Sequence, residues 1–264
     1  MSEMKPEISI IVATKNRPDF LFRCLLAIWR SKFHNFECIV VSDHCNYAKE
    51  VMNDTPFRYD KRFILEENWS TGRILNQKNA GAISKNIGVD MARSNKICYC
   101  DDDNIIFDFH LGTFIGMNDE YTVGYSRFID VLWHNRRISD ILDNDLYFEG
   151  GLRWNGDVVE NKEGTKDNLA MCHTKDVWNK IGGWKTWAEL PDRNEDRDFM
   201  IRIGENVDRV ERYDSVTAIY NQHSLNEDET KKDGEEYEYL LSEMKDRYVY
   251  PHLIKGLKNE YGIY

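Results

Sequence analysis

The fold of this chain is decided by the stretch Lys96-Ile97-Cys98-Tyr99-Cys100-Asp101-Asp102-Asp103-Asn104-Ile105-Ile106. Its apolar run from Ile97 to Cys100 is typical of a buried strand, and three carboxylates follow directly. Because side chains alternate along an extended chain, we expect Asp101 and Asp103 on one side and Asp102 on the other. Carboxylates on one face repel each other, and a hard divalent cation, Mg²⁺ or Mn²⁺, would relieve that repulsion. A solvated acidic turn fits the local pattern equally well.

Composition indicates a globular enzyme. The chain has 264 residues, 41% of them hydrophobic and 31% charged, with a net charge of −11. This balance argues against disorder, and the negative charge argues against a nucleic-acid partner or an anionic membrane surface. No apolar run approaches the ~18–20 residues of a membrane span, and the first seven residues are too polar for a signal peptide. We therefore expect a protein without a transmembrane segment.

The six cysteines are interpreted as small buried hydrophobes. None forms a CxxC pair, and two lie in the apolar run described above. In a chain of this length, that usage is typical of a reducing compartment, so a cytoplasmic location is expected. They are Cys24, Cys38, Cys45, Cys98, Cys100 and Cys172.

The N-terminal region predicts a strand–helix–strand unit. The β-branched run Ile8–Ala13 is broken at Thr14–Pro18, and apolar residues at helical spacing follow up to Ile28. A second strand over Glu37–Val41 ends in Ser42 and Asp43. Helices near 47–52 and 80–92, with a short strand at 62–65, continue the pattern. The order predicts an α/β protein with a parallel sheet.

Three polar clusters should meet at one edge of that sheet. In open α/β sheets, ligands bind beyond the carboxyl ends of the strands. Thr14–Arg17, Asp43 and Asp101–Asp103 all follow predicted strands. An acidic residue in the place of Asp43 can accept hydrogen bonds from a ribose or a base. An ordinary helix cap or turn is the alternative for Asp43 alone, but its neighbours favour a ligand site.

Taken in order, four motifs resemble family 2 glycosyltransferases of the GT-A fold, which are nucleotide-diphospho-sugar transferases with a DxD metal motif. They are Ile8–Pro18, Cys38–Asp43, Ser84–Gly88 and Asp101–Asp103. The similarity covers roughly residues 8–223 and implies a central, mostly parallel sheet flanked by helices. Ala13 and Lys15 replace a common Pro and Tyr, and Lys85 stands where Arg is common, which leaves the choice of nucleotide open.

The resemblance also implies residue roles. Asp43 would contact the nucleobase, Asp101 the ribose and sugar, and Asp103 the metal, Mn²⁺ or Mg²⁺. The remaining residues expected to line the donor site are Thr14, Asn16, Arg17, Lys85, Asn86 and Asp102. The expected domain organisation is a catalytic domain over 1–225, with a nucleotide-sugar half at 8–107 and an acceptor half at 108–225. Residues 226–264 are expected to form an acidic linker and an amphipathic C-terminal helix.

The acceptor half is less regular. Residues 108–167 have poor periodicity and are rich in Trp, Tyr, Asp and Asn. Aromatic faces with amide and carboxylate neighbours commonly hold sugars. The candidates for such a platform are Trp133, Trp154, Trp184 and Trp187. For any single tryptophan, burial in the core is the more common use.

Asp196 is the candidate catalytic base. Residues 195–204 predict a helix whose apolar face holds Phe199, Met200 and Ile203, with Asp196 in the middle of that face. The helix N-terminus favours the charge of Asp196 while burial opposes it, which suits a proton acceptor near neutral pH. A capping carboxylate fits the geometry equally well, but the family's Glu-Asp motif favours the base. Asp198 is predicted on the opposite side, as a solvated partner of Arg202.

His223 is the second candidate metal ligand. It ends a short strand-like run over 218–223, and in many relatives a histidine after the last core strand completes the metal site. A neutral imidazole suits Mn²⁺ somewhat better than Mg²⁺. A lone surface histidine is the alternative.

The sequence therefore predicts an inverting, metal-dependent glycosyltransferase. It would move a sugar from a UDP-sugar or related donor to an acceptor hydroxyl, with a glycan as the expected acceptor. A nucleotidyltransferase is one alternative, but Thr14–Pro18 lacks the usual glycine-rich phosphate loop. A non-catalytic sugar- or nucleotide-binding module is the other. The sugar, the acceptor and the oligomeric state are left open.

Overall fold

The structure is a computed structural model that describes residues 5–43, 46–54, 56–68, 80–118, 120–133, 152–154, 168–186, 189 and 195–223. The chain divides into two compact units. The first comprises Met1–Phe128 and Arg153–Ile219, and the second Ile129–Leu152 and Tyr220–Tyr264. The candidate site described below lies in the first unit.

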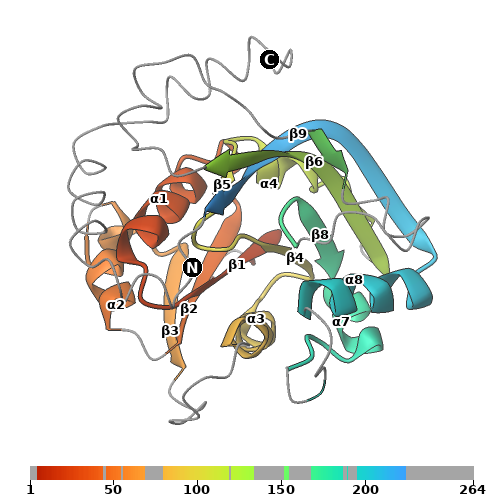
Figure 1. Ribbon diagram of the computed structural model, residues 1–264, viewed down its shortest axis with the longest axis horizontal. Coiled ribbons are helices and arrows are strands. Elements are labelled where there is room, and N and C mark those ends of the chain that lie inside the picture. The colour runs from red at the N-terminus through yellow and green to blue at the C-terminus, as the bar shows by residue number, and fades with distance from the viewer. Residues whose placement is uncertain are drawn as a thin grey trace. The chain divides into compact units, whose positions relative to one another are not determined.

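Up to Tyr99, the described strands and helices follow one another in the alternating order that the sequence predicts (Figure 1). The strands are β1 (Ile8–Thr14), β2 (Phe36–Asp43), β3 (Phe63–Asn68), β4 (Lys96–Tyr99), β5 (Ile105–Ile106), β6 (Thr122–Trp133), β7 (Leu152–Trp154), β8 (Met171–Thr174) and β9 (Arg209–His223). The helices are α1 (Pro18–Trp29), α2 (Tyr47–Met52), α3 (Ala80–Met91), α4 (His110–Thr113), α7 (Lys175–Ile181) and α8 (Glu195–Asn206), with a 3₁₀ turn, η1 (Phe57–Tyr59).

The nine described strands form one mixed sheet, in which eight follow the order β3-β2-β1-β4-β8-β6-β9-β5 and β7 pairs with β6. β1 pairs in parallel with both β2 and β4, and β2 pairs in parallel with β3. The sheet is antiparallel where β4 meets β8, where β6 meets β8 and where β5 meets β9. The predicted α/β fold is confirmed, with a parallel half that the sequence anticipates strand by strand.

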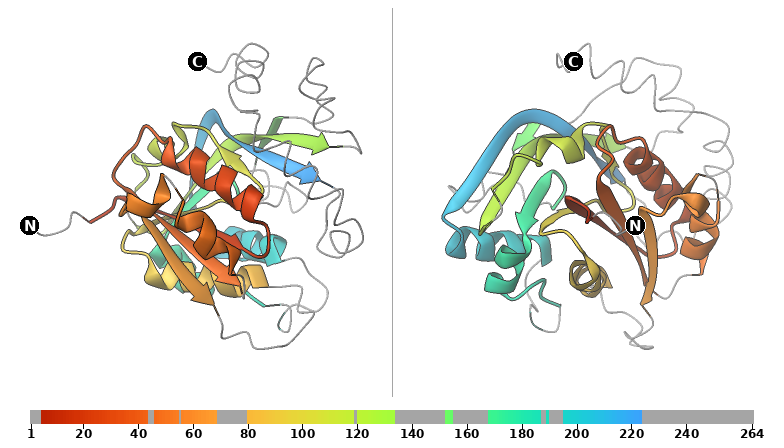
Figure 2. Two further views of the ribbon diagram at one scale, coloured as in Figure 1. Left: turned by 90° about the vertical axis from the view of Figure 1, so that its left-hand side faces the viewer. Right: turned by 180° about the vertical axis from the view of Figure 1, so that it is seen from behind.

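Helices cover both faces of the parallel half. In Figures 1 and 2, α1 and α2 lie on one side of β1–β3 and α3 lies on the other. Every residue of β2 is buried, as expected for a strand covered on both faces. A hydrophobic core cluster on the α3 side joins β1, β2 and β4 to α3, α7 and α8. This cluster holds the helices that carry the candidate site at fixed positions.

Two strands differ from the sequence-based expectation. β9 begins at Arg209, nine residues before the predicted run at 218, and β6 lies within the region of poor periodicity. Between residues 209 and 215 the chain is charged and largely exposed, so the apolar run that identifies a strand is present only after Ser215. The predicted linker and helix at 226–264, and Cys45, lie outside the described residues.

The five described cysteines are buried free thiols, as predicted. Burial raises the pKa of Cys38, and the Cys24 and Cys100 sulfurs lie 3.6 Å apart beneath the acidic turn. Across the described part of the chain, none of the helices has the length and apolar character that crossing a membrane requires.

Helix α3 approaches β1 so closely that one position has no room for a side chain. A Cβ atom on Gly88 would overlap the side chain of Ile11. We expect Gly88→Ala to lower the free energy of unfolding by about 1–3 kcal/mol, because overpacking outweighs the gain in helix propensity. Denaturant titration measures the change. Gly116→Ala, where no atom lies within 4 Å of the added carbon, is the control, and equal effects of the two changes would contradict this account.

Two buried histidines make stability sensitive to acid. Burial lowers the pKa of His110 to about 3 and that of His173 to about 4, from an unfolded value of 6.5. At these two histidines the unfolded state therefore binds more protons between these values, so the stability that they contribute is present above pH 6.5 and is lost as pH falls towards 3. Each histidine should contribute a slope of about 1.4 kcal/mol per pH unit.

We expect His110→Asn to be less stable at pH 7 but to lose stability less steeply between pH 6.5 and 4. The shorter amide leaves a gap, yet it removes one of the two groups that must be protonated on unfolding. Denaturant unfolding at several pH values measures the slope. A slope as steep as that of the unsubstituted protein would contradict the assignment.

Candidate active site

The predicted polar clusters meet at the carboxyl edge of the parallel strands. Thr14 ends β1, Asp43 ends β2, and the acidic turn follows β4, which pairs in parallel with β1. Asp43 is buried and its Oδ2 lies 3.3 Å from the Lys15 Nζ. The loop that leaves β1 therefore faces the ends of the neighbouring strands, as the α/β topology requires.

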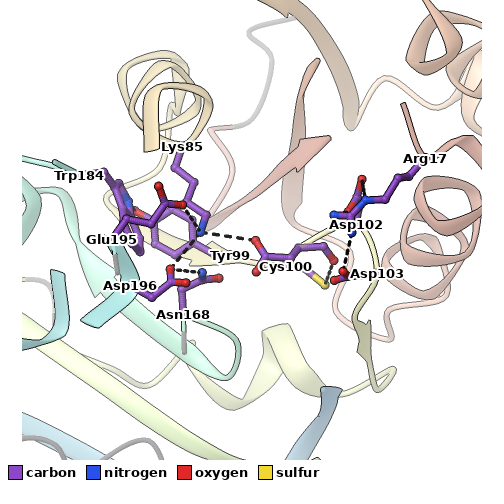
Figure 3. A network of polar contacts seen from close by, with 11 residues as sticks. Arg17, Lys85, Tyr99, Cys100, Asp102, Asp103, Asn168, Trp184, Glu195 and Asp196 are labelled. Atoms are coloured by element: carbon purple, nitrogen blue, oxygen red, sulfur yellow. Dashed lines mark hydrogen bonds and ion pairs between the residues drawn. The ribbon is translucent and has the colours of Figure 1, made fainter. Parts of the chain in front are cut away.

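Arg17 links this loop to the acidic turn. Asn16 adopts a left-handed conformation (φ 52°) between β1 and α1, and Arg17 then occupies the N-cap of α1. Its guanidinium forms ion pairs with Asp102 and, at 2.8 Å, with the Oδ2 of Asp103. Thr14 Oγ1 donates a hydrogen bond of 2.7 Å to Asp102. Thr14 and Arg17 therefore bind the same carboxylate. Figure 3 shows Arg17 beside Asp102 and Asp103.

The three aspartates differ in environment. The side chain of Asp102 is fully buried, whereas those of Asp101 and Asp103 are 28% and 17% exposed. The difference in burial agrees with the expectation that Asp102 lies on the other side of the chain from Asp101 and Asp103. The turn nevertheless brings Asp102 and Asp103 to the same guanidinium, that of Arg17. β4 ends at Tyr99, and the Asn104 N–H donates to the Asp101 carbonyl, which closes a turn instead of extending the strand.

Burial shifts the pKa values of the ionisable side chains at this turn. Burial raises the pKa of Asp102 to about 7, and the charge of Arg17 offsets part of that rise. For Arg17 itself, burial opposes the charged form but the nearby carboxylates outweigh it, and its pKa is raised. Asp102 is therefore a structural anchor for the guanidinium more than an exposed ligand.

Lys85 joins the acidic turn to helix α8. It lies on α3 with a side chain only 4% exposed, and its Nζ lies 3.5 Å from Asp101, 3.8 Å from Glu195 and 3.1 Å from Asp196. Burial opposes the ammonium charge, but Asp101, Asp196 and Glu195 outweigh it and raise the pKa of Lys85 well above its ordinary value. Figure 3 shows Lys85 between the β4 end and the first turn of α8.

Asp196 is held from two sides. Its Oδ1 accepts hydrogen bonds from Lys85 Nζ at 3.1 Å and from Asn168 Nδ2 at 2.8 Å. Asn168 is fully buried just before β8. Sequence reasoning missed Asn168 as a site residue, because nothing in a lone asparagine before a strand indicates a carboxylate partner over a separation of 28 residues.

Glu195 is turned towards the first turn of α3. A Cβ on Gly81 would overlap its carboxylate, and Glu195 accepts a hydrogen bond from the Ala82 N–H. Burial raises the pKa of Glu195 to about 7, and Lys85 counteracts the rise. Glu195 and Asp196 are adjacent in sequence and both lie near Lys85, while Glu195 also binds the Ala82 N–H and Asp196 also binds Asn168.

Asn86 holds the Gly-Gly-aromatic turn that follows α7. Its Nδ2 donates to the Trp184 carbonyl at 2.9 Å, and its Oδ1 accepts from the Trp184 N–H and from Trp178 Nε1. Gly182 and Gly183 have φ of 76° and 66°, and a Cβ on Gly183 would crowd Asn86 Oδ1. The donor-binding role of Asn86 stays a prediction, while these contacts give it a structural one.

Trp184 is part of the core. It is only 2% exposed, so it is not an open sugar platform. The side chains of Trp133, Trp154 and Trp187 lie outside the described part of the structure. The more common use of a single tryptophan therefore applies to Trp184.

Asp198 pairs with Arg202 as predicted, at 2.7 Å, but the pair is not solvated. Asp198 is 4% exposed, and Arg202 Nη1 donates to the carbonyls of Ile181 and Gly183 at 2.7 Å. Arg202 thus ties α8 to the turn after α7. The solvent-exposed interpretation is wrong because α7 and its turn cover this side of α8.

The described carboxylates of the site do not form a complete set of metal ligands. Five carboxylates surround two cations, Arg17 and Lys85; they are Asp101, Asp102, Asp103, Glu195 and Asp196. Among the described side chains, no three His, Cys, Asp or Glu groups converge on a metal position. The donor set fits an ion held by one or two carboxylates with substrate phosphates and water completing it. The side chain of His223 lies outside the described residues, so its role stays a prediction.

The chain is similar in sequence and in fold to known glycosyltransferases. Residues 9–129 match glycosyl transferase family 2. A curated relative, glycosyltransferase GlyG from Streptococcus pneumoniae serotype 4, is 27% identical over 188 residues, covering 70% of this chain and 52% of GlyG. This chain thus spans about half the length of that relative.

Two solved structures share the fold. S. aureus TarS (residues 1–349) in complex with UDP-GlcNAc aligns with a TM-score of 0.61 and 14% identity, covering 83% of this chain and 60% of TarS. The mannosyltransferase PcManGT from Pyrobaculum calidifontis, in complex with GDP-Man and Mn²⁺, aligns with a TM-score of 0.51 and 14% identity, covering 83% of this chain and 57% of PcManGT. Together, the match at residues 9–129 and the shared fold confirm that this chain resembles the family 2 glycosyltransferases of the GT-A fold.

Proposed function

We propose that this protein transfers a sugar from a nucleotide-diphospho-sugar, with a UDP-sugar as the expected donor, to an acceptor hydroxyl such as that of a glycan. The observation that carries the proposal is the position of Lys85, which contacts Asp101 at the strand end and Asp196 on α8. A donor site at the strand ends and a proton acceptor on the helix are thereby joined in one cluster, as a direct displacement requires.

The charge balance supports metal dependence. A nucleoside diphosphate is anionic, yet the site has more carboxylates than cations, so an additional positive charge is needed before a diphosphate can bind. Asp103, which retains 17% exposure, would hold Mn²⁺ or Mg²⁺. When bound, the ion would neutralise the diphosphate leaving group. Arg17, at the start of α1, is close enough to contribute to the same charge.

Asp196 is the proposed base. It would accept the proton of the acceptor hydroxyl as that oxygen attacks the anomeric carbon. Asn168 and Lys85 both bind its Oδ1, which fixes the orientation of the carboxylate. Glu195 is turned towards α3, so the geometry favours a single base without a second carboxylate acting as nucleophile. One displacement with one base inverts the anomeric configuration, and we therefore propose an inverting mechanism.

The names of the structural neighbours support the choice of donor. TarS is described with UDP-GlcNAc, and PcManGT with GDP-Man and Mn²⁺. Asp43, Thr14 and Asn16 lie at the ends of β1 and β2, where the nucleoside of such a donor would bind. We expect a cytoplasmic location, in agreement with the buried free thiols.

A screen of UDP- and GDP-sugars tests this function. We expect one donor to raise the unfolding free energy by about 2.7 kcal/mol at 100 times its dissociation constant, and to release nucleoside diphosphate with Mn²⁺ but not with a chelator. Asp103→Asn should weaken the response to Mn²⁺. Asp108→Asn, which alters an ion pair with Lys32 elsewhere, is the control.

The same screen separates the alternatives. A nucleotidyltransferase would consume a nucleoside triphosphate and release pyrophosphate. A binding module would be stabilised by a nucleotide-sugar without releasing any nucleotide. Either result, repeated with Mn²⁺ and acceptor present, would overturn the proposed function.

Replacement of the base tests the mechanism. We expect Asp196→Asn to lower kcat by about 10²–10⁴-fold, because an amide cannot accept the proton, while donor binding persists. Steady-state kinetics and a donor titration measure the two effects. Asp214→Asn, at a side chain that is 82% exposed, should leave kcat unchanged. Near-normal turnover of a folded Asp196→Asn protein would exclude Asp196 as the base.

A further inference from the structure

A chain of hydrogen bonds runs through the core behind the candidate site. Trp184 Nε1 donates to the Tyr99 hydroxyl at 3.0 Å, and that hydroxyl lies 2.8 Å from His173 Nε2. His173 Nδ1 lies 2.9 Å from the Thr174 carbonyl, which can only accept. Nδ1 therefore carries the proton, Nε2 accepts, and Tyr99 donates to it. The indole N–H, the phenol hydroxyl, the imidazole and the Thr174 carbonyl therefore each have a hydrogen-bond partner, with every donor pointing towards Thr174.

A buried row of hydrogen bonds costs stability if any of its polar groups lacks a partner. Apolar side chains could fill the same space. Tyr99, His173 and Trp184 are all essentially buried. A phenylalanine and a leucine in the places of Tyr99 and His173 would contribute a similar apolar core without a polar group to satisfy. What the hydrogen bonds add is a fixed orientation of the rings they join.

Trp184 is the member of this hydrogen-bonded row that contacts residues of the candidate site. Its ring stacks on Phe199 with centroids 3.8 Å apart and planes 4° apart. The Lys85 Nζ lies 4.6 Å from the centroid of the same indole. Rings stacked this closely leave no room for an ammonium between them, so Lys85 lies on the other face. Figure 3 shows Trp184 beside Lys85 and Glu195.

The two neighbours of the indole, Lys85 and Phe199, are both connected to Asp196. Lys85 binds its Oδ1 directly, and Phe199 lies one turn after Asp196 on α8. A rotation of the Trp184 ring would therefore displace the ammonium and the helix turn that carries the carboxylate. The orientation of the indole ring therefore determines where the Asp196 carboxylate lies.

We propose that Tyr99 and His173 are positioning residues, which set the plane of the Trp184 indole and thereby hold Lys85 and helix α8 in the arrangement that orients Asp196. The inference rests on the proposed role of Asp196. None of these residues contacts the solvent-facing side of the site, so they act through Trp184 and not on a substrate.

Tyr99→Phe tests the proposal in the full-length chain, with Tyr125→Phe as a matched control. Tyr125 is equally buried in the same core cluster, but its hydroxyl has no hydrogen-bond partner in the described structure. We expect Tyr99→Phe to lower kcat per folded molecule by about 10- to 100-fold with the donor KM changed less than about twofold, because misplacement of a base affects the chemical step. Tyr125→Phe should retain the unsubstituted kcat.

Two substitutions of His173, the hydrogen-bond partner of Tyr99, test the proposal even if Tyr99→Phe does not fold. His173→Gln keeps an acceptor for Tyr99 and should retain most of the kcat, whereas His173→Leu removes it and should resemble Tyr99→Phe. If Tyr99→Phe fails to fold, this pair decides. Equal kcat values for Gln and Leu, or for Tyr99→Phe and Tyr125→Phe, would overturn the inference and leave the proposed function intact.

A spectroscopic readout keeps the test independent of turnover. The Lys85 CεH₂ signal of ¹³C-lysine-labelled protein, identified by its loss in Lys85→Arg, should be shifted upfield by the indole ring current. We expect the upfield shift to decrease in Tyr99→Phe and to persist in Tyr125→Phe. If no donor is turned over, the proposed function fails and this signal decides the positioning, since an unchanged shift in Tyr99→Phe contradicts it.

Discussion

The arrangement of the site depends on one buried ammonium group. Lys85 lies on a helix that packs against β1 and β2, and it faces carboxylates from the β4 end and from α8. Without that charge, Asp101, Glu195 and Asp196 would repel one another in a region that water reaches poorly. Removing one member of such a cluster leaves the others uncompensated, so the position of three separate elements depends on it.

A second cation organises the other half of the site. Arg17 holds the acidic turn against the start of α1, and Thr14 adds a hydrogen bond to the same carboxylate. The two cations divide the consecutive aspartates between them. The remaining excess of negative charge supports the proposal that the donor binds with a divalent ion, because carboxylates repel an anionic diphosphate.

The sequence predicts much of this arrangement. The β-branched runs of β1 and β2 and the acidic stretch after β4 indicate a parallel sheet with polar strand ends, since these signals are local. The environment of Asp198, the partners of the acidic turn and the role of Asn168 were not predictable in the same way. Each depends on packing between segments far apart in sequence, such as the cover that α7 and the turn after it provide over the side of α8 that carries Arg202. Periodicity indicates which face of a helix is apolar, but not what lies against its polar face.

The turn that follows β4 assigns each of three consecutive acidic residues a different surrounding. Asp101 faces Lys85, Asp102 is buried beneath Arg17, and Asp103 keeps partial contact with solvent. Surface loops usually tolerate a gained or lost residue. Here, deletion of a single aspartate would shift the others by one place and exchange their surroundings although the composition of the loop barely changes. Variation in the length of this turn is therefore far more restricted than variation in the loops that join the helices.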